Sequence, residues 1–187
     1  MNKRTIIGLA LTLGVALQAQ TTIEYRAKVG LVSAQGDLLS LTNRHQGYFF
    51  EVGANLSIKD PDLGLYFHLG HLVVRRDALD SGNYADVKDT WFGLDLQYPV
   101  TSKFGLFTGP TLNQWDVTAL TGPYPDTNWK LGWRIGGRYS VTKSWSVEAI
   151  YSLSEWTQLQ RKNRDGTLRP TRNMAPTWFT VGAAYTF

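Results

Sequence analysis

The chain has 187 residues, of which 43% are hydrophobic and 18% charged, a composition that fits one folded domain and excludes an intrinsically disordered chain. It contains no cysteine, which excludes disulfide bonds and thiolate chemistry. Its formal charge of +4 falls to about +2 without the two basic residues of the N-terminal segment, so the charge does not indicate nucleic-acid binding.

The first 19 residues have the features of a secretory signal peptide. Lys3 and Arg4 precede an apolar run that is too short to be a transmembrane helix, which needs about 20 residues. Small residues follow this run, and the last of them, Ala19, marks the expected cleavage site. A buried N-terminal helix is the alternative interpretation. We predict a signal peptide over 1–19 and a single exported domain over 20–187.

The rest of the chain alternates apolar residues with polar or small ones. In the first such segment, Ile23, Val29 and Leu31 belong to the apolar set, whereas Arg26 and Lys28 belong to the other set. A period of two is typical of a β-strand with two different faces, and the 18 glycines and 13% aromatic residues also favour strands and turns. In chain order, the expected strands are 23–33, 47–58, 63–74, 90–98, 104–115, 128–141, 144–154 and 178–187.

The connections between these strands alternate between short and long ones. Short polar turns are expected at 59–62, 99–103 and 142–144, and long polar loops at 35–46, 75–89, 116–128 and 156–175. Short turns at one end of the strands and long loops at the other are typical of an outer-membrane β-barrel. Pro110 weakens the prediction of the fifth strand, because proline has no N–H group to donate to a ladder.

Two all-β folds share this periodicity and differ in which set of residues faces inward. A soluble barrel would bury the apolar set, whereas a membrane barrel turns that set towards lipid. The export signal, the nearly uninterrupted apolar set and the glycine-rich, charged opposite set favour the membrane barrel. We therefore predict an all-β fold, namely an eight-stranded antiparallel up-and-down transmembrane β-barrel with short periplasmic turns and long extracellular loops.

Charged residues of both signs belong to the set that would face the interior of this barrel. An eight-stranded barrel is only wide enough for side chains to fill it, so these charges need to pair with one another. Glycines in the same set leave room for long side chains to cross. The expected interior charges are Glu24, Arg26, Lys28, Glu51, Asp95, Lys130, Arg134, Arg138 and Glu148.

Aromatic residues of the apolar set lie near the ends of the expected strands. Such positions form a girdle in membrane barrels, because amphipathic rings are stable at the level of the lipid headgroups. Two members, Tyr48 and Trp129, are expected at the loop end. Those expected at the short-turn end are Tyr25, Tyr98, Phe104, Tyr139, Trp145 and Phe187.

By its pattern, the whole of 20–187 resembles the small eight-stranded outer-membrane barrels of the outer-membrane protein A and X types. The most specific part of the resemblance is the last strand, which ends on an aromatic residue and carries apolar residues at every second position. The resemblance implies that this strand is a signal that the barrel assembly machinery recognises by strand pairing. The expected signal residues are Phe179, Val181, Ala183, Tyr185 and Phe187.

Some barrels of this type are enzymes that modify lipid A, usually with the help of a histidine near the outer leaflet. Here His45 lies in an expected loop, His68 faces the interior by its phase, and His71 faces lipid. The nearest hydroxyls and acid are those of Ser152, Ser154 and Glu155, but the spacing expected for lipid A deacylases, with a serine two residues after a histidine, is absent. We therefore interpret His68 as a packed interior residue and predict no enzyme activity.

Two loops carry clusters of charge. Asp77, Asp80, Asp86 and Asp89 have oxygen ligands that suit calcium, but their spacing matches no known calcium loop, so we predict no metal site. Guanidinium groups pair well with the phosphates of lipopolysaccharide, although a solvated basic loop is the simpler interpretation. The possible lipopolysaccharide contacts are Arg75, Arg76, Arg161, Lys162, Arg164, Arg169 and Arg172.

These features together predict a monomeric protein of the cell outer membrane in a Gram-negative cell. Its expected role is structural or interactional, in membrane integrity, adhesion or defence through its loops. A narrow pore for small solutes is the first alternative and a lipid A-modifying enzyme is the second. The expected partners are outer-membrane lipid, lipopolysaccharide and the assembly machinery. We expect no cofactor, because no glycine-rich phosphate loop or zinc spacing occurs, and no nucleic acid.

Overall fold

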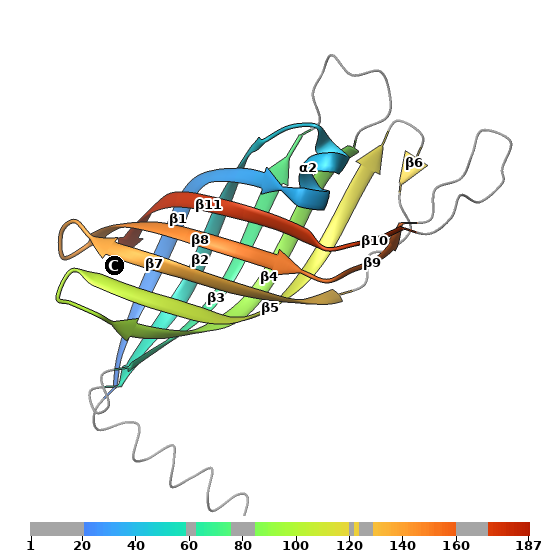
Figure 1. The fold of residues 1–187 in the computed structure, drawn as a ribbon. Coiled ribbons are helices and arrows are strands. Elements are labelled where there is room, and N and C mark those ends of the chain that lie inside the picture. The colour runs from blue at the N-terminus through green and yellow to red at the C-terminus, as the bar shows by residue number, and fades with distance from the viewer. Residues whose placement is uncertain (1–20, 59–62, 76–84, 120–121, 124–128, 160–171) are drawn as a thin grey trace, which may run out of the picture.

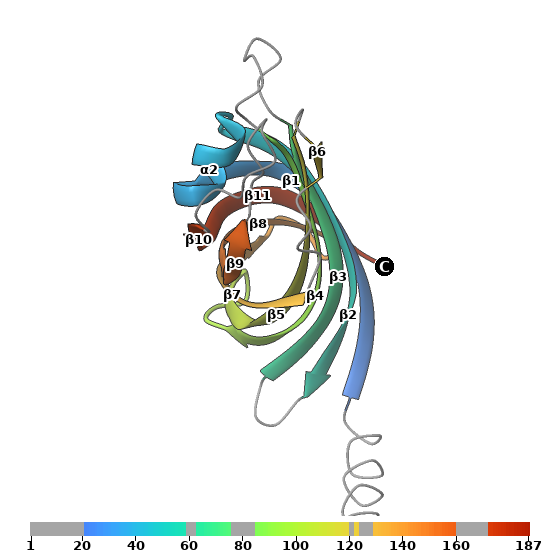
Figure 2. The same ribbon diagram turned by 90° about the vertical axis from the view of Figure 1, so that its right-hand side faces the viewer.

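Eight long antiparallel strands form a closed barrel, which confirms the predicted fold class (Figures 1 and 2). The computed structural model describes residues 21–58, 63–75, 85–119, 122–123, 129–159 and 172–187. Each long strand pairs with its neighbours along the chain, and the last pairs with the first to close the barrel. The strands are β1 (Thr21–Gln35), β2 (Gln46–Ile58), β3 (Leu63–Val74), β4 (Ala85–Pro99), β5 (Phe104–Ala119), β7 (Trp129–Ser140), β8 (Trp145–Ser154) and β11 (Pro176–Thr186).

Two of the short turns share one hydrogen-bonding pattern, which the sequence repeats as VTSKF (100–104) and VTKSW (141–145). In each turn the threonine hydroxyl accepts a hydrogen bond of 2.9 Å from a backbone N–H, that of Phe104 for Thr101 and that of Trp145 for Thr142. Threonine side chains stabilise tight turns in this way. These two turns lie at the end of the barrel that we call the short-turn end.

Four smaller elements lie at the opposite end, which we call the loop end (Figure 1). They are helix α2 (Gly36–Thr42) and the short strands β6 (Gly122–Pro123), β9 (Trp156–Leu159) and β10 (Arg172–Met174). Asn43 ends the helix in the left-handed conformation, with φ of 49°, and its N–H donates to the carbonyl of Leu39. In the described part of the chain, no helix is both long enough and apolar enough to span a membrane.

The expected loops were therefore wrong in part. The segment 35–46 contains helix α2, and β4 begins at Ala85, so Asp86 and Asp89 lie in a strand rather than in a loop. The start of β4 was not predicted, because the other strands carry their apolar residues on the outward face. In this segment the apolar residues Ala85 and Val87 face inward.

Other strand ends also differ from the prediction. The expected loops 116–128 and 156–175 contain the end of β5 and the short strands β6, β9 and β10, and β11 begins at Pro176. Strand β5 continues through Pro110, but its ladder to β4 is interrupted there. Pairing between the two strands stops at Gly93↔Thr111 and begins again at Leu96↔Thr108. The missing N–H of proline explains this interruption.

The barrel interior changes in character from one end to the other. At the loop end it is apolar, with a cluster that includes Phe49, Trp91, Trp115 and Trp178 and that packs against Leu38 of helix α2. The middle is charged, and the short-turn end is lined by polar residues. The sequence pattern predicted an interior of glycines and charges of both signs, and the gathering of inward aromatic residues into an apolar cluster at the loop end is a finding of the structure.

Candidate functional site in the barrel interior

Six buried charged residues from five strands occupy the middle of the barrel. We call this cluster the ion-pair layer. Each of these side chains is at most 4% exposed, and the cluster contains three cations and three carboxylates. Its members are Arg26, Lys28, Glu51, Asp95, Arg134 and Glu148.

Arg134 links two carboxylates from different strands. Its Nε atom donates to both carboxylate oxygens of Asp95 on β4, at 2.9 and 3.1 Å, and Nη2 also donates to Asp95. Its Nη1 atom donates to Glu51 on β2, and the Nε1 atom of Trp91 donates to the same carboxylate at 3.3 Å. Since the guanidinium bonds to Asp95 in a fork, its position is set by geometry as well as by charge.

Lys28 extends this network towards β8. Its Nζ atom lies 2.7 Å from Glu51 and 2.6 Å from Glu148, so one ammonium group joins two carboxylates. Arg26 lies 3.5 Å from Glu148. The chain of contacts from Asp95 through Arg134, Glu51 and Lys28 to Glu148 crosses the barrel, and charges buried in this way need such partners to be tolerated.

Two aromatic rings pack against the cations of the layer. Nζ of Lys28 lies 4.5 Å from the ring centroid of Tyr66, and the guanidinium carbon of Arg26 lies 5.0 Å from it. The Phe107 ring lies 5.8 Å from the guanidinium carbon of Arg134. Cations at these distances are attracted to the ring faces. The period of two places both rings in the inward-facing set, but their contacts with the cations could not be predicted from it.

The other predicted interior charges lie outside this network. Glu24, Lys130 and Arg138 are half-buried, and neither Glu24 nor Arg138 forms an ion pair with another described residue. His68 lies inside the layer. Its ring nitrogens are 3.6 Å from Glu51 and 3.5 Å from Asp95, and its ring stacks on Tyr66 with centroids 5.5 Å apart.

A serine–histidine catalytic pair is not formed by the described side chains. Neither ring nitrogen of His68 has a hydrogen-bond partner among the described residues. The hydroxyl of Ser154 instead accepts a hydrogen bond from Trp115 Nε1 at 3.2 Å and donates to the carbonyl of Glu155. His71 Nδ1 lies 2.9 Å from the hydroxyl of Thr90, on the neighbouring strand. Ser154 and His71 are thus each in contact with a side chain of another strand.

The outer face carries the predicted girdle residues. Their side chains point outward with exposed fractions between 38% for Phe104 and 76% for Phe187. At the short-turn end, the ring of Tyr185 lies 5.0 Å from both Trp145 and Phe187, in edge-to-face contacts. Of the expected signal residues on the last strand, Phe179, Val181, Ala183 and Phe187 are exposed, and Tyr185 is half-buried. Recognition of this strand by the assembly machinery stays a prediction.

Most of the basic residues predicted to contact lipopolysaccharide lie outside the described residues. These are Arg76, Arg161, Lys162, Arg164 and Arg169; Arg172 begins β10, but its side chain is not described. Arg75 is exposed directly after β3. Among the side chains that the structure describes, no group of three or more histidines and acids is close enough to hold a metal ion.

Comparisons with known structures find the same fold at low sequence identity. Pseudomonas aeruginosa outer membrane protein OprG is 12% identical with a TM-score of 0.54, over 90% of this chain and 97% of that one. Neisserial surface protein A is 15% identical with a TM-score of 0.53, over 89% and 99%. Yersinia pestis Ail in a phospholipid nanodisc is 14% identical with a TM-score of 0.51, over 89% and 100%.

A comparison with curated protein sequences finds no significant match. The model of one protein family, in contrast, matches nearly the whole chain, over residues 7–187. This match confirms the resemblance to small outer-membrane barrels that the alternation and the last strand suggested. The chain belongs to the family described as the outer membrane protein beta-barrel domain.

Proposed function

We propose that this chain is an integral protein of the cell outer membrane that conducts no solutes and has a structural or interactional role. The observation that carries this proposal is the filled interior. The ion-pair layer crosses the middle of the barrel, and the apolar cluster with helix α2 lies between this layer and the loop end. Eight strands leave room only for side chains, and two successive layers of side chains occupy that room.

The first prediction concerns ion conductance. The refolded protein is expected to produce no steady current steps in a planar lipid bilayer, because ions would have to cross both layers. Trp178→Ala opens only the apolar layer, so this variant is expected to stay silent as well. A wide porin in the same bilayer serves as the positive control. Discrete steps from the wild-type protein that change in size with Arg134→Ser would contradict the proposal and favour a narrow pore.

With the middle and the loop end of the interior filled, the loops and the outer surface are the parts available to a partner outside the cell. A groove of about 470 Å³, which we call the rim groove, lies at the loop end. Leu31, Tyr48 and Val73 supply apolar surface, and Arg44 and Arg75 supply two exposed cations. Tyr48 belongs to the predicted girdle at the level of the headgroups. We propose that the groove binds lipopolysaccharide, with phosphates on the arginines and acyl chain on the apolar residues.

The second prediction tests the rim groove. Native mass spectrometry of the refolded barrel with lipid A is expected to detect a complex that Arg44→Ala/Arg75→Ala weakens at least tenfold, or about 1.4 kcal/mol, because charge-assisted hydrogen bonds to phosphate are lost. Lys103→Ala/Lys143→Ala removes the same charge from the short-turn end and is expected to bind normally. Dephosphorylated lipid A should show no difference between the variants. Equal weakening by both double variants would show that the overall charge of the protein determines the affinity, and it would refute binding at the rim groove.

A lipid A-modifying activity receives no support from the described side chains, because His68 is enclosed by carboxylates and Ser154 is engaged with Trp115. The monomeric state and the cleavage of residues 1–19 stay predictions.

A further inference from the structure

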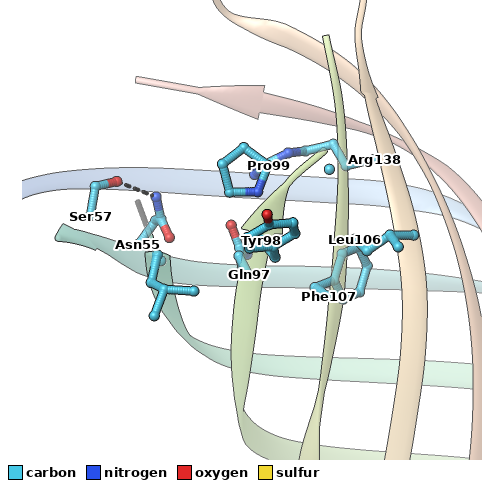
Figure 3. Close-up of a pocket in the computed structure, with 11 residues that line it drawn as sticks. Asn55, Ser57, Gln97, Tyr98, Pro99, Leu106, Phe107 and Arg138 are labelled. Carbon is cyan, nitrogen blue, oxygen red and sulfur yellow. Dashed lines mark hydrogen bonds between the residues drawn. The ribbon is translucent and has the colours of Figure 1, made fainter. Parts of the chain in front are cut away.

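The short-turn end of the barrel interior contains two adjoining hollows of about 120 and 110 Å³. Arg138 lines both of them. The larger hollow, shown in Figure 3, is bounded by residues from β2, β3, β4, β5 and β7. Leu63 and Pro99, which begin β3 and end β4, lie at its rim, so it opens at the short-turn end of the barrel. In an outer-membrane barrel this end faces the periplasm.

Arg138 is the interior arginine that the ion-pair layer does not use. Its Nη1 atom is buried and has no hydrogen-bond partner among the described residues. Glu148, which lies directly opposite it in the β7–β8 register, instead contacts Lys28 at 2.6 Å and Arg26 at 3.5 Å. A buried guanidinium N–H without an acceptor is unfavourable, so an acceptor that reaches this hollow is stabilised there.

The same hollow also presents acceptors that lack a donor. The Oδ1 atom of Asn55 and the Oε1 atom of Gln97 are buried, and neither has a hydrogen-bond partner among the described residues. The orientation of the Asn55 amide is set by its Nδ2 atom, which donates to Ser57 at 3.0 Å. Both oxygens converge over Gly64, at 3.1 and 3.6 Å from the position that a Cβ atom would take there. The glycine therefore leaves space between two amide oxygens.

The hollow thus combines one unpaired guanidinium donor with two unpaired carbonyl acceptors. We propose that it binds a small carboxylate that also carries a hydrogen-bond donor, such as a short hydroxy acid. The planar carboxylate would pair with the fork of Arg138, and the ligand hydroxyl would donate to Gln97 or Asn55. The buried ring of Phe107 supplies apolar contact at the side. Because the ion-pair layer closes the interior beyond the hollow, this is a binding site and not a passage.

The test is a titration of the refolded, ¹⁵N-labelled full-length barrel in detergent with glycolate, acetate and inorganic phosphate at constant ionic strength. We expect saturable shifts of the Arg138 Nε signal and of the Asn55 and Gln97 side-chain amide signals with glycolate. Acetate lacks the hydroxyl and is expected to bind at least threefold more weakly. Phosphate that binds as tightly as glycolate would show general anion attraction and overturn the assignment, as would glycolate shifts that do not saturate.

Three variants complete the test, each checked for folding by the heat-shifted band of the unboiled protein on a gel. Arg138→Gln is expected to weaken glycolate binding at least tenfold. Arg138→Lys keeps the charge but not the forked guanidinium, and it is expected to weaken binding less than Arg138→Gln does. It replaces Arg138→Gln in the test if that variant does not fold. Lys103→Gln removes an exposed cation from the same end and is expected to bind normally. Equal weakening by Lys103→Gln and Arg138→Gln would refute the site.

Discussion

Replacing Arg134 with methionine is expected to lower the free energy of unfolding by about 3–5 kcal/mol, the usual effect of removing one partner from a buried ion pair. The guanidinium bonds to both Asp95 and Glu51, and those carboxylates are 0% and 1% exposed. Without it, the ion-pair partner left to Asp95 among the described residues is His68, whose Nε2 atom lies 3.5 Å away and is charged only when the ring is protonated. The measurement is equilibrium unfolding in urea of the barrel refolded into lipid vesicles.

The matched control is Arg138→Met, on the same strand and the same inward face. It removes no ion pair among the described residues, so we expect a loss of about 1 kcal/mol or less. The double variant Arg134→Met/Asp95→Asn removes one charge of each sign and is expected to recover at least half of the loss, since Lys28 still pairs with Glu51. Similar midpoints for the Arg134 and Arg138 variants would show that the ion-pair layer does not stabilise the barrel.

Replacing Gly182 with alanine is expected to destabilise the barrel by about 2–3 kcal/mol through overpacking at the junction of the first and last strands. Gly182 lies directly opposite Gly30 in the β11–β1 register. A Cβ atom at Gly182 would lie 2.6 Å from the backbone carbonyl oxygen of Val29 and 2.8 Å from the ring of Phe49. The ring can move, but the carbonyl belongs to the ladder that closes the barrel, so the strands themselves have to shift.

Gly137→Ala is the control for this prediction. A Cβ atom there would meet the Phe104 ring at 3.2 and 3.3 Å, and no backbone atom is among its nearest neighbours. We expect a change within about 1 kcal/mol, since the ring can move and alanine lowers the entropy of the unfolded chain. Urea unfolding and the fraction that refolds into vesicles measure both variants. An equal change in the free energy of unfolding for the two variants would contradict the prediction, because it would show that a Cβ atom at the junction of β1 and β11 causes no additional strain.

Local pattern was sufficient to predict the class of fold and the orientation of its faces. Each strand has a period of two, and that period is visible without knowledge of its neighbours. The alternation also predicted that six charged residues of the ion-pair layer face inward, and the structure places all six inside. These residues are Arg26, Lys28, Glu51, Asp95, Arg134 and Glu148. The strand ends near 85 and 176 were missed because inward apolar residues at the loop end disturb the expected alternation.

Pairing between side chains required the tertiary structure. Arg134 and Glu51 are 83 residues apart, and the contact between them depends on the curvature of a closed sheet, which no local pattern contains. The same holds for the apolar cluster beneath helix α2, for the convergence of Asn55 and Gln97 over Gly64, and for Arg138, which is left outside the network. Alternation determines which residues face inward, but only barrel closure determines which of them meet.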